Sequence, residues 1–415
     1  MDQHRTNGFL LYCLRKDSDG TRGSRLKELS NSDWEPIVQE SNRHGVTPLL
    51  YHRLKTLHPG TPIPNEVEQR LRRSYLESVS RNMGLYYKLG KVLEILRHEN
   101  IPVIALKGAH LAGVVYASIG LRPMNDVDLL VHKDDLMRAE VALLQIDFTP
   151  LDFNRVVWKD NSHFAYRLPS REFSVEVHWN FLPSMYPFNI DIDGQWERSR
   201  PAIIAGVEVS ILSPEDLLLY LCLHASKHLF EMGLKLLYDI FEAIRHYGKE
   251  IDWKQTQLRS GQWGVEKCVY LALKLARNLL GASVPDEVLE TFEPNDFDER
   301  FMAIAMQQIF PNGIGTSRGL PLSSNVAQLW GNKRLRDKIN ILLKTTFPSP
   351  NVMARMYPPS SNSPRIYFYY CVRIADLLQR YGQVIWRLLH RNQKMLARTR
   401  RQNEITALKD WLMSA

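Results

Sequence analysis

One segment constrains the fold of this chain more than any other: LKGAHLAGVVYASIGLRPMNDVDLLV, from Leu106 to Val131. It holds a Lys-Gly turn after an apolar strand and ends in a second apolar strand that carries Asp126 and Asp128. Alternate side chains along a strand share a face, so both carboxylates point one way while Val127 points into the core. Two like charges held together repel, and a site that keeps them usually holds a divalent cation. A strand, a glycine turn, a helix and an acid pair are what metal-dependent phosphoryl transfer would need.

The aspartate pair also has a structural interpretation. The apolar residues around it bury the strand, and a buried carboxylate needs a charge partner or a metal. Arg122 or Arg155 could supply that charge, and acid pairs beside turns also act as caps or lie at solvated edges. Both interpretations remain open at this point.

Composition limits the class of protein. A length of 415 residues predicts two or three folded units, and 44% apolar with 24% charged residues is typical of a globular protein. The net charge of +8 favours anionic partners such as nucleotides, RNA or a membrane surface. Cys13, Cys222, Cys268 and Cys371 are widely spaced, which argues against a disulfide framework or a zinc knuckle and favours a reducing, cytoplasmic location.

No transmembrane segment is predicted. The N-terminal stretch MDQHRTNGFLLYCLRKDSDG has only a short apolar run and is a poor signal peptide. Residues 101–120 are nearly apolar over a membrane-length window, but Pro102, Lys107, Gly108 and Gly113 are among the residues that interrupt it. We expect a buried strand, turn and helix there instead of a span.

Hydrophobic periodicity divides the chain into four regions. Residues 1–97 are predicted to be helical and residues 98–212 to form a core of short strands. Helices return in residues 213–300, and residues 301–415 form a basic helical region. The predicted class is α/β (α+β): a small mixed sheet flanked by N- and C-terminal helical regions.

Individual elements follow from the same periods. A capping box of Ser32 and Glu35 is predicted to open one helix, and a second helix covers Pro64 to Arg97. The strands are expected at Val103–Leu106, Val127–Val131, His163–Arg167 and Glu172–His178, with a hairpin at Ile203–Leu212 and a helix at Asp134–Leu144. Ser213 and Pro214 form a helix start, and later helices are expected to break at Pro285, PNGIGTSRGLPLSSN and FPSPNVMARMYPPSSNSPR.

Glu176 is the best candidate for a third carboxylate. The stretch Phe173 to Trp179 alternates so that Glu176 and His178 share a strand face. Two-metal sites use such an acid trio to align a nucleophile with a triphosphate. The alternative is that Glu176 is a plain surface residue.

The Lys-Gly turn is a candidate phosphate site. Gly108 permits close backbone approach, the following helix offers free N–H groups, and Lys107 adds a positive charge. Arg122 could clamp a phosphate or could form an ion pair with Asp126. A lone Lys-Gly pair is common, so its value lies in its position between the two strands.

His224, Lys227 and His228 lie on one face of the helix that begins after Ser213. They could contact the base or triphosphate of a nucleotide, or they could pair structurally with Asp239 on the next helix. The pattern is not H-E-x-x-H, which argues against a zinc protease.

The segment RLLHRNQKMLARTRR carries six cations and no acid: Arg387, Arg391, Lys394, Arg398, Arg400 and Arg401. It is predicted to form a helix that is either a solvated face of a bundle or a surface for RNA or anionic lipid.

These motifs together resemble the bacterial family of uncharacterised nucleotidyltransferases in the DNA polymerase β-like superfamily. The matching segments are ESNRHGVTPLLYHRLK, ALKGAHLAGVVYASIGLRPMNDVDLLV, FSVEVHWN, VEVSILSPEDLLLYLCLHASKHLF and LKLLYDIFEAI. The resemblance implies that Asp126, Asp128 and Glu176 are metal ligands and that Lys107 with Gly108 forms the nucleotide-phosphate turn. The superfamily commonly has Gly-Ser after the first strand and a shorter gap to the acids, so this chain departs from the pattern at its phosphate turn.

The predicted activity is therefore Mg²⁺-dependent (or Mn²⁺-dependent) transfer of a nucleoside monophosphate from an NTP to an acceptor, with release of pyrophosphate. A sugar, a peptide natural product, an antibiotic, a tRNA end and a protein side chain all remain open as acceptors. The alternative is a catalytically inactive regulator that binds nucleotide or RNA.

Overall fold

The chain folds into two compact units, formed by Met1–Phe310 with Leu412–Ala415 and by Pro311–Trp411. The computed structural model describes residues 1–15, 26, 29–57, 63–151, 161–170, 173–311, 335–358, 363–389 and 393–414. The finer division into four regions at residues 97, 212 and 300 stays a prediction.

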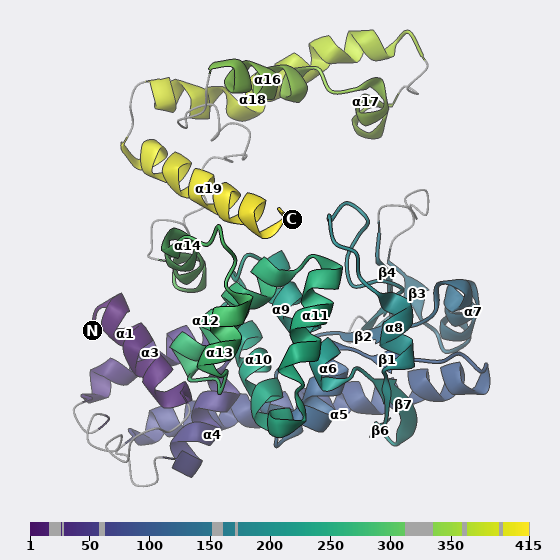
Figure 1. Cartoon of the computed structure of the whole chain (residues 1–415), viewed down its shortest axis with the longest axis vertical. Coiled ribbons are helices and arrows are strands. Elements are labelled where there is room, and N and C mark those ends of the chain that lie inside the picture. The colour runs from purple at the N-terminus through teal and green to yellow at the C-terminus, as the bar shows by residue number, and fades with distance from the viewer. Residues whose placement is uncertain are drawn as a thin grey trace. The chain divides into compact units, whose positions relative to one another are not determined.

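The first unit contains a seven-stranded mixed sheet (Figure 1). Its strands are β1 (Ile104–Ala105), β2 (Val127–Leu130), β3 (Thr149–Pro150), β4 (His163–Arg167), β5 (Ser174–His178), β6 (Arg200–Ile204) and β7 (Val207–Ile211). Their order is β3-β4-β5-β2-β1-β7-β6, in which β2 pairs with β5 and β1 pairs with β7 in parallel, and the other neighbours are antiparallel. The predicted mixed sheet is confirmed.

Helices precede, interrupt and follow this sheet. Those before it are α1 (Gln3–Leu14), α3 (Asn31–Arg43), α4 (Thr47–Leu57) and α5 (Asn65–His98). Those between its strands are α6 (Lys107–His110), the π-helical turn η1 (Leu111–Val115), the 3₁₀ turns η2 (Ile119–Leu121) and η3 (Lys133–Asp135), α7 (Leu136–Gln145) and α8 (Ile192–Glu197). Those after it are α9 (Pro214–Lys227), α10 (Leu234–Tyr247), η5 (Gly248–Glu250), α11 (Trp253–Trp263), α12 (Glu266–Leu280), α13 (Asp286–Phe292) and α14 (Glu299–Ile309).

One face of the sheet is buried under α5 and α7. Leu89 and Val92 of α5 pack with Val127 and Leu129 of β2 and with Leu143 of α7 in one hydrophobic core. Each such side chain, fully buried, contributes roughly 1.5–3 kcal/mol to stability. Figure 1 shows the long helix α5 extending past the sheet and also below the helical bundle. Because this face is apolar, the polar alternate residues of β2 and β5 must lie on the other face.

Local signals place the elements around the site. Ser213 caps α9, its side chain accepting a hydrogen bond from the backbone N–H of Asp216, and Pro214 occupies the first turn. The hairpin between β6 and β7 turns at Ala205 and Gly206, which both have positive φ, 53° and 82°. Both features agree with the sequence prediction, because each depends on adjacent residues only.

Two predicted details are wrong. The capping box that opens α3 is formed by Ser30 and Asp33, not by Ser32 and Glu35, and the N–H of Ser30 donates to the Asp33 carboxylate at 3.0 Å. Glu35 instead pairs with Arg70 of α5. The periodic stretch that follows is two helices, α3 and α4, separated at Gly45, whose φ is 65°.

The second unit consists of helices in its described part: α16 (Leu335–Thr346), α17 (Pro350–Met356), α18 (Ile366–Leu389) and α19 (Gln393–Leu412). Helix α17 lies inside FPSPNVMARMYPPSSNSPR, where the sequence predicted only a break. Pro350 is tolerated because it occupies the first turn of α17. The break predicted at PNGIGTSRGLPLSSN lies, apart from Pro311, outside the described residues.

The predicted basic helix is divided between two helices. Arg387 belongs to α18, and Lys394, Arg398, Arg400 and Arg401 belong to α19. Arg391 and the side chains of Arg387 and Lys394 lie outside the described residues.

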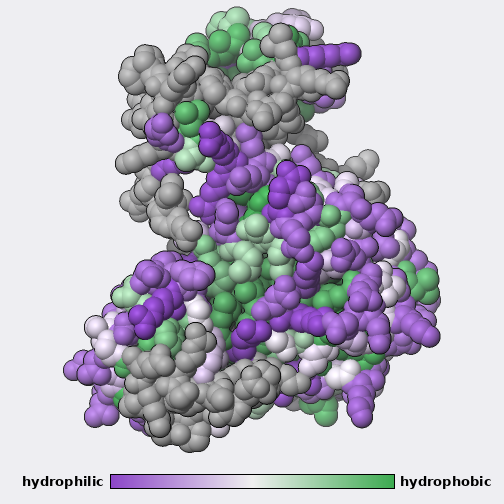
Figure 2. Space-filling model, turned by 60° about the vertical axis from the view of Figure 1, so that its left-hand side comes forward, coloured by the Kyte–Doolittle hydropathy of each residue, from purple (hydrophilic) through white to green (hydrophobic). Residues whose placement is uncertain are grey.

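The second unit also exposes large apolar side chains, including Leu342, Leu343, Tyr367, Phe368 and Leu378, and Figure 2 shows green side chains on it. Helices in the described part of the chain are either too short or too polar to cross a bilayer.

Candidate functional site

The candidate site lies on the polar face of β2 and β5. These strands run in parallel with Asp128 opposite Glu176 and Leu130 opposite His178. Val127 and Val175 point into the core, so Asp128, Glu176 and His178 share the other face. The alternation that the sequence predicted for each strand therefore also brings the acids of the two strands together.

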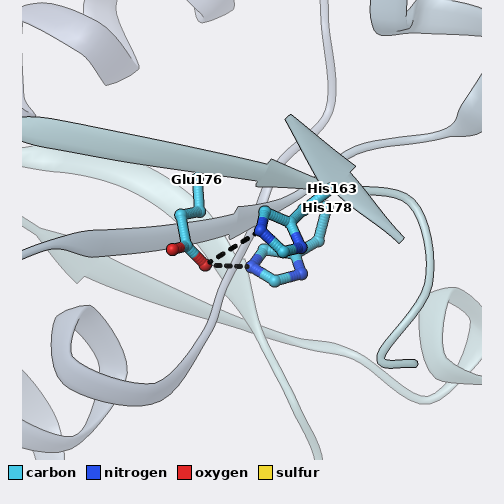
Figure 3. A group of neighbouring side chains, drawn as sticks. All are labelled: His163, Glu176 and His178. Carbon is cyan, nitrogen blue, oxygen red and sulfur yellow. Dashed lines mark ion pairs between the residues drawn. The ribbon is translucent and has the colours of Figure 1, made fainter. Parts of the chain in front are cut away.

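Asp128 lies at the centre of a hydrogen-bonded cluster. Its side chain is buried, and its Oδ1 accepts from Lys107 Nζ and lies 3.0 Å from His178 Nε2. The same His178 nitrogen lies 3.2 Å from Glu176 Oε2. His163, on β4 opposite His178, brings its Nε2 to 3.8 Å from that glutamate oxygen (Figure 3). One imidazole nitrogen thus joins two carboxylates.

The cluster perturbs the protonation of its members. Burial alone would raise the pKa of Asp128, but Lys107 and His178 hold it well below its ordinary value. A hydrogen bond from His178 lowers the pKa of Glu176. Burial would lower the pKa of Lys107, but the negative groups around it, Asp128 and Glu176 among them, raise it above its ordinary value. The two acids are therefore ionised and Lys107 is charged at neutral pH.

Asp126 precedes β2 and is exposed. Burial of its surroundings and the negative charges of Asp128 and Glu176 raise the pKa of its carboxyl. The three acids therefore act on one another electrostatically, as acids that share one cleft do. Arg122 is not the structural partner considered for this pair, because it is bonded to Asp239, and Arg155 lies outside the described residues.

The Lys-Gly turn begins α6 directly after β1. Lys107 has a φ of 35°, in the left-handed region that L-residues rarely adopt. A Cβ at Gly108 would lie 2.6 Å from Met124 Sδ and 2.9 Å from Arg122 Nη1. A larger residue at position 108 would therefore force these side chains to move.

Arg122 is committed to a second acid. Its Nε and Nη2 each donate to Asp239 of α10 at 2.8 Å, and the Tyr116 hydroxyl donates to the same carboxylate at 2.8 Å. The ion pair of Arg122 with Asp126 that the sequence allowed is absent from the described residues. Asp239 likewise pairs with neither His224 nor Lys227 in this part of the chain, contrary to the structural interpretation of those residues.

One pocket of about 380 Å³ collects all of the candidate residues. These are Lys107, Gly108, Arg122, Asp126, Asp128, Glu176, His224, Lys227 and His228. His224 and Lys227 belong to α9, and His228 is the C-cap residue directly after it. Burial together with the charge of Lys107 lowers the pKa values of His224 and Lys227, and burial with Lys227 lowers that of His228. Their roles in binding stay predictions, but their positions are those that the predicted roles require.

Four titratable residues of this pocket were not among the predicted site residues: His163, His178, Tyr220 and Lys235. The sequence placed His178 on the same strand face as Glu176 but assigned it no role. The alternation of His163–Arg167 predicted a strand and could have indicated His163 as a further site residue. Burial and the nearby Arg122 lower the pKa of Lys235 to about 8. No local pattern marks Lys235, because α10 brings it to the pocket from a separate part of the chain.

A larger pocket of about 1130 Å³ adjoins the first, and Leu182 lines both. Aromatic side chains contribute much of its lining, including Trp179, Trp196 and Trp263, together with His132, which stacks on Trp196 at 4.0 Å between ring centroids. Polar groups complete it, among them Asn161, Asn180, Asp191, Asp193, Lys133 and Gln262. His178 and Trp179 are consecutive and line different pockets, so the end of β5 separates the two.

Comparisons with known proteins identify the family of this chain. Residues 30–281 match the model of a family described as uncharacterised nucleotidyltransferase. Two similar solved structures are of the same enzyme. A solution structure of the antibiotic-resistance factor ANT(2'')-Ia has 15% identity and a TM-score of 0.33, and the match covers 48% of this chain and 98% of that chain. A crystal structure of ANT(2")-Ia in complex with adenylyl-2"-tobramycin has 13% identity and a TM-score of 0.32, and the match covers 42% of this chain and 94% of that chain. No curated protein matches the sequence. Because the family match spans more than half of the chain, this protein belongs to the uncharacterised nucleotidyltransferase family and is a nucleotidyltransferase.

Proposed function

We propose that the protein transfers a nucleoside monophosphate from an NTP to a hydroxyl-bearing acceptor and releases pyrophosphate. One observation carries the proposal: Asp128 and Glu176 lie side by side on parallel strands, with Asp126 beside them, in a pocket lined by lysines. Oxygen donors of this kind suit Mg²⁺, and lysine ammonium groups suit a triphosphate.

The residues present fit a divalent ion. Asp126, Asp128 and Glu176 bring three carboxyl groups together, and burial together with the charges of the other two raises the pKa of Asp126. Both bonds to Asp128 fall on Oδ1, while no described residue bonds to its Oδ2. We propose Asp126 and Asp128 as the ligands of Mg²⁺ or Mn²⁺, with Glu176 as the third acid. When bound there, the ion would neutralise negative charge on the triphosphate and on the departing pyrophosphate.

The cations of the pocket would orient the nucleotide. Lys107 lines the pocket from the sheet side, Lys227 from α9 and Lys235 from α10. In the reaction the acceptor oxygen forms a bond to the α-phosphorus. The bond between that phosphorus and the oxygen that bridges it to the β-phosphorus breaks, and pyrophosphate leaves. Glu176 would help to hold a second ion or would accept the proton of the acceptor hydroxyl. His224 and His228 would border the nucleotide from the helical side.

We place the acceptor in the adjoining pocket. Its tryptophans offer flat apolar surfaces, and its carboxylates and amides offer hydrogen bonds, a combination that fits a polyhydroxylated or amine-bearing molecule. The indole N–H groups of Trp196 and Trp263 are buried and have no hydrogen-bond partner in the described part of the chain.

A test uses the full-length protein with α-labelled NTPs, Mg²⁺ and pools of small molecules and RNA. The readouts are label transfer, pyrophosphate release and binding of a non-hydrolysable Mg²⁺–NTP by calorimetry. We expect Asp126→Asn with Asp128→Asn to abolish all three, whereas Glu94→Gln, an exposed change on α5, should preserve them. Equal binding by the wild type and the double variant would contradict the proposal, and binding without any transfer would favour the non-catalytic regulator.

The basic residues of α18 and α19 are proposed as a separate contact surface for an anionic partner, RNA or a lipid surface. Of those with described side chains, Arg400 is exposed and Arg398 and Arg401 are half-buried. Binding of this kind weakens steeply with salt, because neutralised phosphates release counterions. Gel shifts with tRNA and cosedimentation with anionic vesicles, each at two salt concentrations, distinguish the two partners.

A further inference from the structure

Two histidines that the proposed Mg²⁺ ligation does not use form a cluster with Glu176, the third acid of that site. His163 comes from β4, and Glu176 and His178 come from β5, with His163 directly opposite His178 in the antiparallel pair. One potential ligand atom of each lies within 4.8 Å of the other two. Figure 3 shows both imidazoles directed toward the Glu176 carboxylate. Among the described residues this is the only such group of three.

The distances are close to those around a single bound ion. Two ligands bonded at about 2.1 Å and separated by 90–109° are roughly 3.0–3.4 Å apart. His178 Nε2 lies 3.2 Å from Glu176 Oε2 and 3.0 Å from Asp128 Oδ1. His163 Nε2 lies 3.8 Å from the same glutamate oxygen, so a small rotation of its half-exposed ring would complete the set.

The donor set selects the type of ion. Mg²⁺ prefers oxygen ligands and retains water, whereas imidazole nitrogens favour transition-metal ions. Two imidazoles and one or two carboxylates on one face of a sheet leave coordination positions open toward the pocket. Sites with three protein ligands and an open position are typical of metal ions that contact substrate.

We propose that His163, Glu176 and His178 hold one divalent transition-metal ion, of the Mn²⁺, Co²⁺ or Zn²⁺ class, before any nucleotide binds. Ion binding by these residues stands by itself, while a catalytic use of the ion next to Asp128 rests on the proposed nucleotidyl transfer. Nδ1 of both rings has no hydrogen-bond partner in the described part of the chain. Metal-bound histidines usually donate that N–H, and loss of such a partner costs about 10–100-fold in affinity. The proposed site is therefore of moderate affinity.

Co²⁺ is the probe, because its visible absorption reports the ligands and needs no enzyme activity. The full-length protein is stripped with a chelator and titrated with Co²⁺ in the absence of nucleotide, by absorption and by calorimetry. We expect one equivalent to bind with the growth of ligand-field bands. His163→Gln should weaken this binding by more than about tenfold, since a lost ligand costs at least as much as a lost partner of a ligand. His163 is the preferred position because its side chain is 36% exposed.

Three further variants complete the design. His178→Gln tests the buried ligand, and its circular dichroism shows whether the fold survives. The exposed His246→Gln is the matched histidine control, which should bind Co²⁺ like the wild type. Asp126→Asn should impair Mg²⁺–NTP binding but leave Co²⁺ binding within about twofold, because Asp126 is outside the proposed ligand set.

The outcomes separate this proposal from the proposed function. No Co²⁺ binding by the wild type, or equal binding by the folded His163→Gln variant, would overturn the metal site even if nucleotidyl transfer with Mg²⁺ is intact. Co²⁺ binding that is lost in His163→Gln would support the metal site even if no transfer is found.

Discussion

Two buried ion pairs in the first unit differ in how completely their carboxylates are bonded. In the closed cluster of Tyr116, Arg122 and Asp239, both oxygens of Asp239 accept hydrogen bonds at 2.8 Å, and Arg122 binds them with two nitrogens. In the open cluster of Lys107, Asp128, Glu176 and His178, both bonds to Asp128 share one oxygen and the group lines a pocket.

The difference in bonding separates structure from function. In a bidentate pair both oxygens of the carboxylate are already bonded to the guanidinium, and removing one partner leaves a buried charge uncompensated. A carboxylate with an unbonded oxygen, next to acids whose charges help to raise the pKa of Asp126, has capacity for a cation. We therefore assign the closed cluster to the fold and the open cluster to chemistry.

The largest expected effect is on the open cluster. Asp126→Asn should lower nucleotidyl transfer by orders of magnitude, because loss of a metal ligand removes several kcal/mol of transition-state stabilisation. The melting temperature should be unchanged, since Asp126 is exposed and is repelled by Asp128 and Glu176. Single-turnover kinetics and thermal melts check both expectations. A fall in melting temperature in proportion to the lost activity would mean that this cluster is structural.

The closed cluster should show the opposite behaviour. Asp239→Ala should lower the free energy of unfolding by about 3–5 kcal/mol, because it leaves Arg122 charged and buried. Glu250→Ala, which breaks the exposed pair of Arg200 with Glu250, is the control and should cost no more than about 1 kcal/mol. Urea denaturation measures both. A stable Asp239→Ala protein that no longer binds NTP would assign Arg122 to the triphosphate, as the sequence allowed.

The pH dependence of nucleotide binding sharpens the contrast. Burial and Arg122 lower the pKa of Lys235 to about 8, so this lysine is charged below pH 8 and neutral above it. Affinity for Mg²⁺–NTP should therefore fall by roughly fivefold, or about 1 kcal/mol, as the pH rises through 8. Calorimetry across this range should give a flat profile for Lys235→Met and an unchanged profile for the exposed control Lys249→Met. A slope that persists in Lys235→Met would mean that another group titrates.

The smallest expected effect concerns α9. Lys227 lines the pocket, and no described residue forms an ion pair with it. Lys227→Ala should weaken Mg²⁺–NTP binding about twofold to threefold, with an unchanged melting temperature, because salt screens a half-exposed charge. If the affinity is unchanged and the melting temperature falls, Lys227 has a structural role, like the residues of the closed cluster.

Short-range patterns in the sequence determined much of this protein. Strand alternation placed Asp128 with Asp126 and Glu176 with His178, and Ser213 with Pro214 specified the start of α9, because these features depend on neighbouring residues only. The capping box was predicted at the wrong residues, Ser32 and Glu35. In the structure Ser30 and Asp33 form it, and Glu35 pairs with Arg70 of α5.

Partner choice was decided by the tertiary structure alone. Arg122 and Asp239 are distant in sequence, and only the packing of α10 against the segment between β1 and β2 shows that Arg122 bonds to Asp239 instead of Asp126. His163 meets Glu176 and His178 because the register of β4 on β5 puts it there, and Lys235 reaches the pocket from α10. Side-chain face is a local property of a strand or helix, whereas the identity of an ionic partner depends on how distant elements pack, and no short-range pattern records that packing.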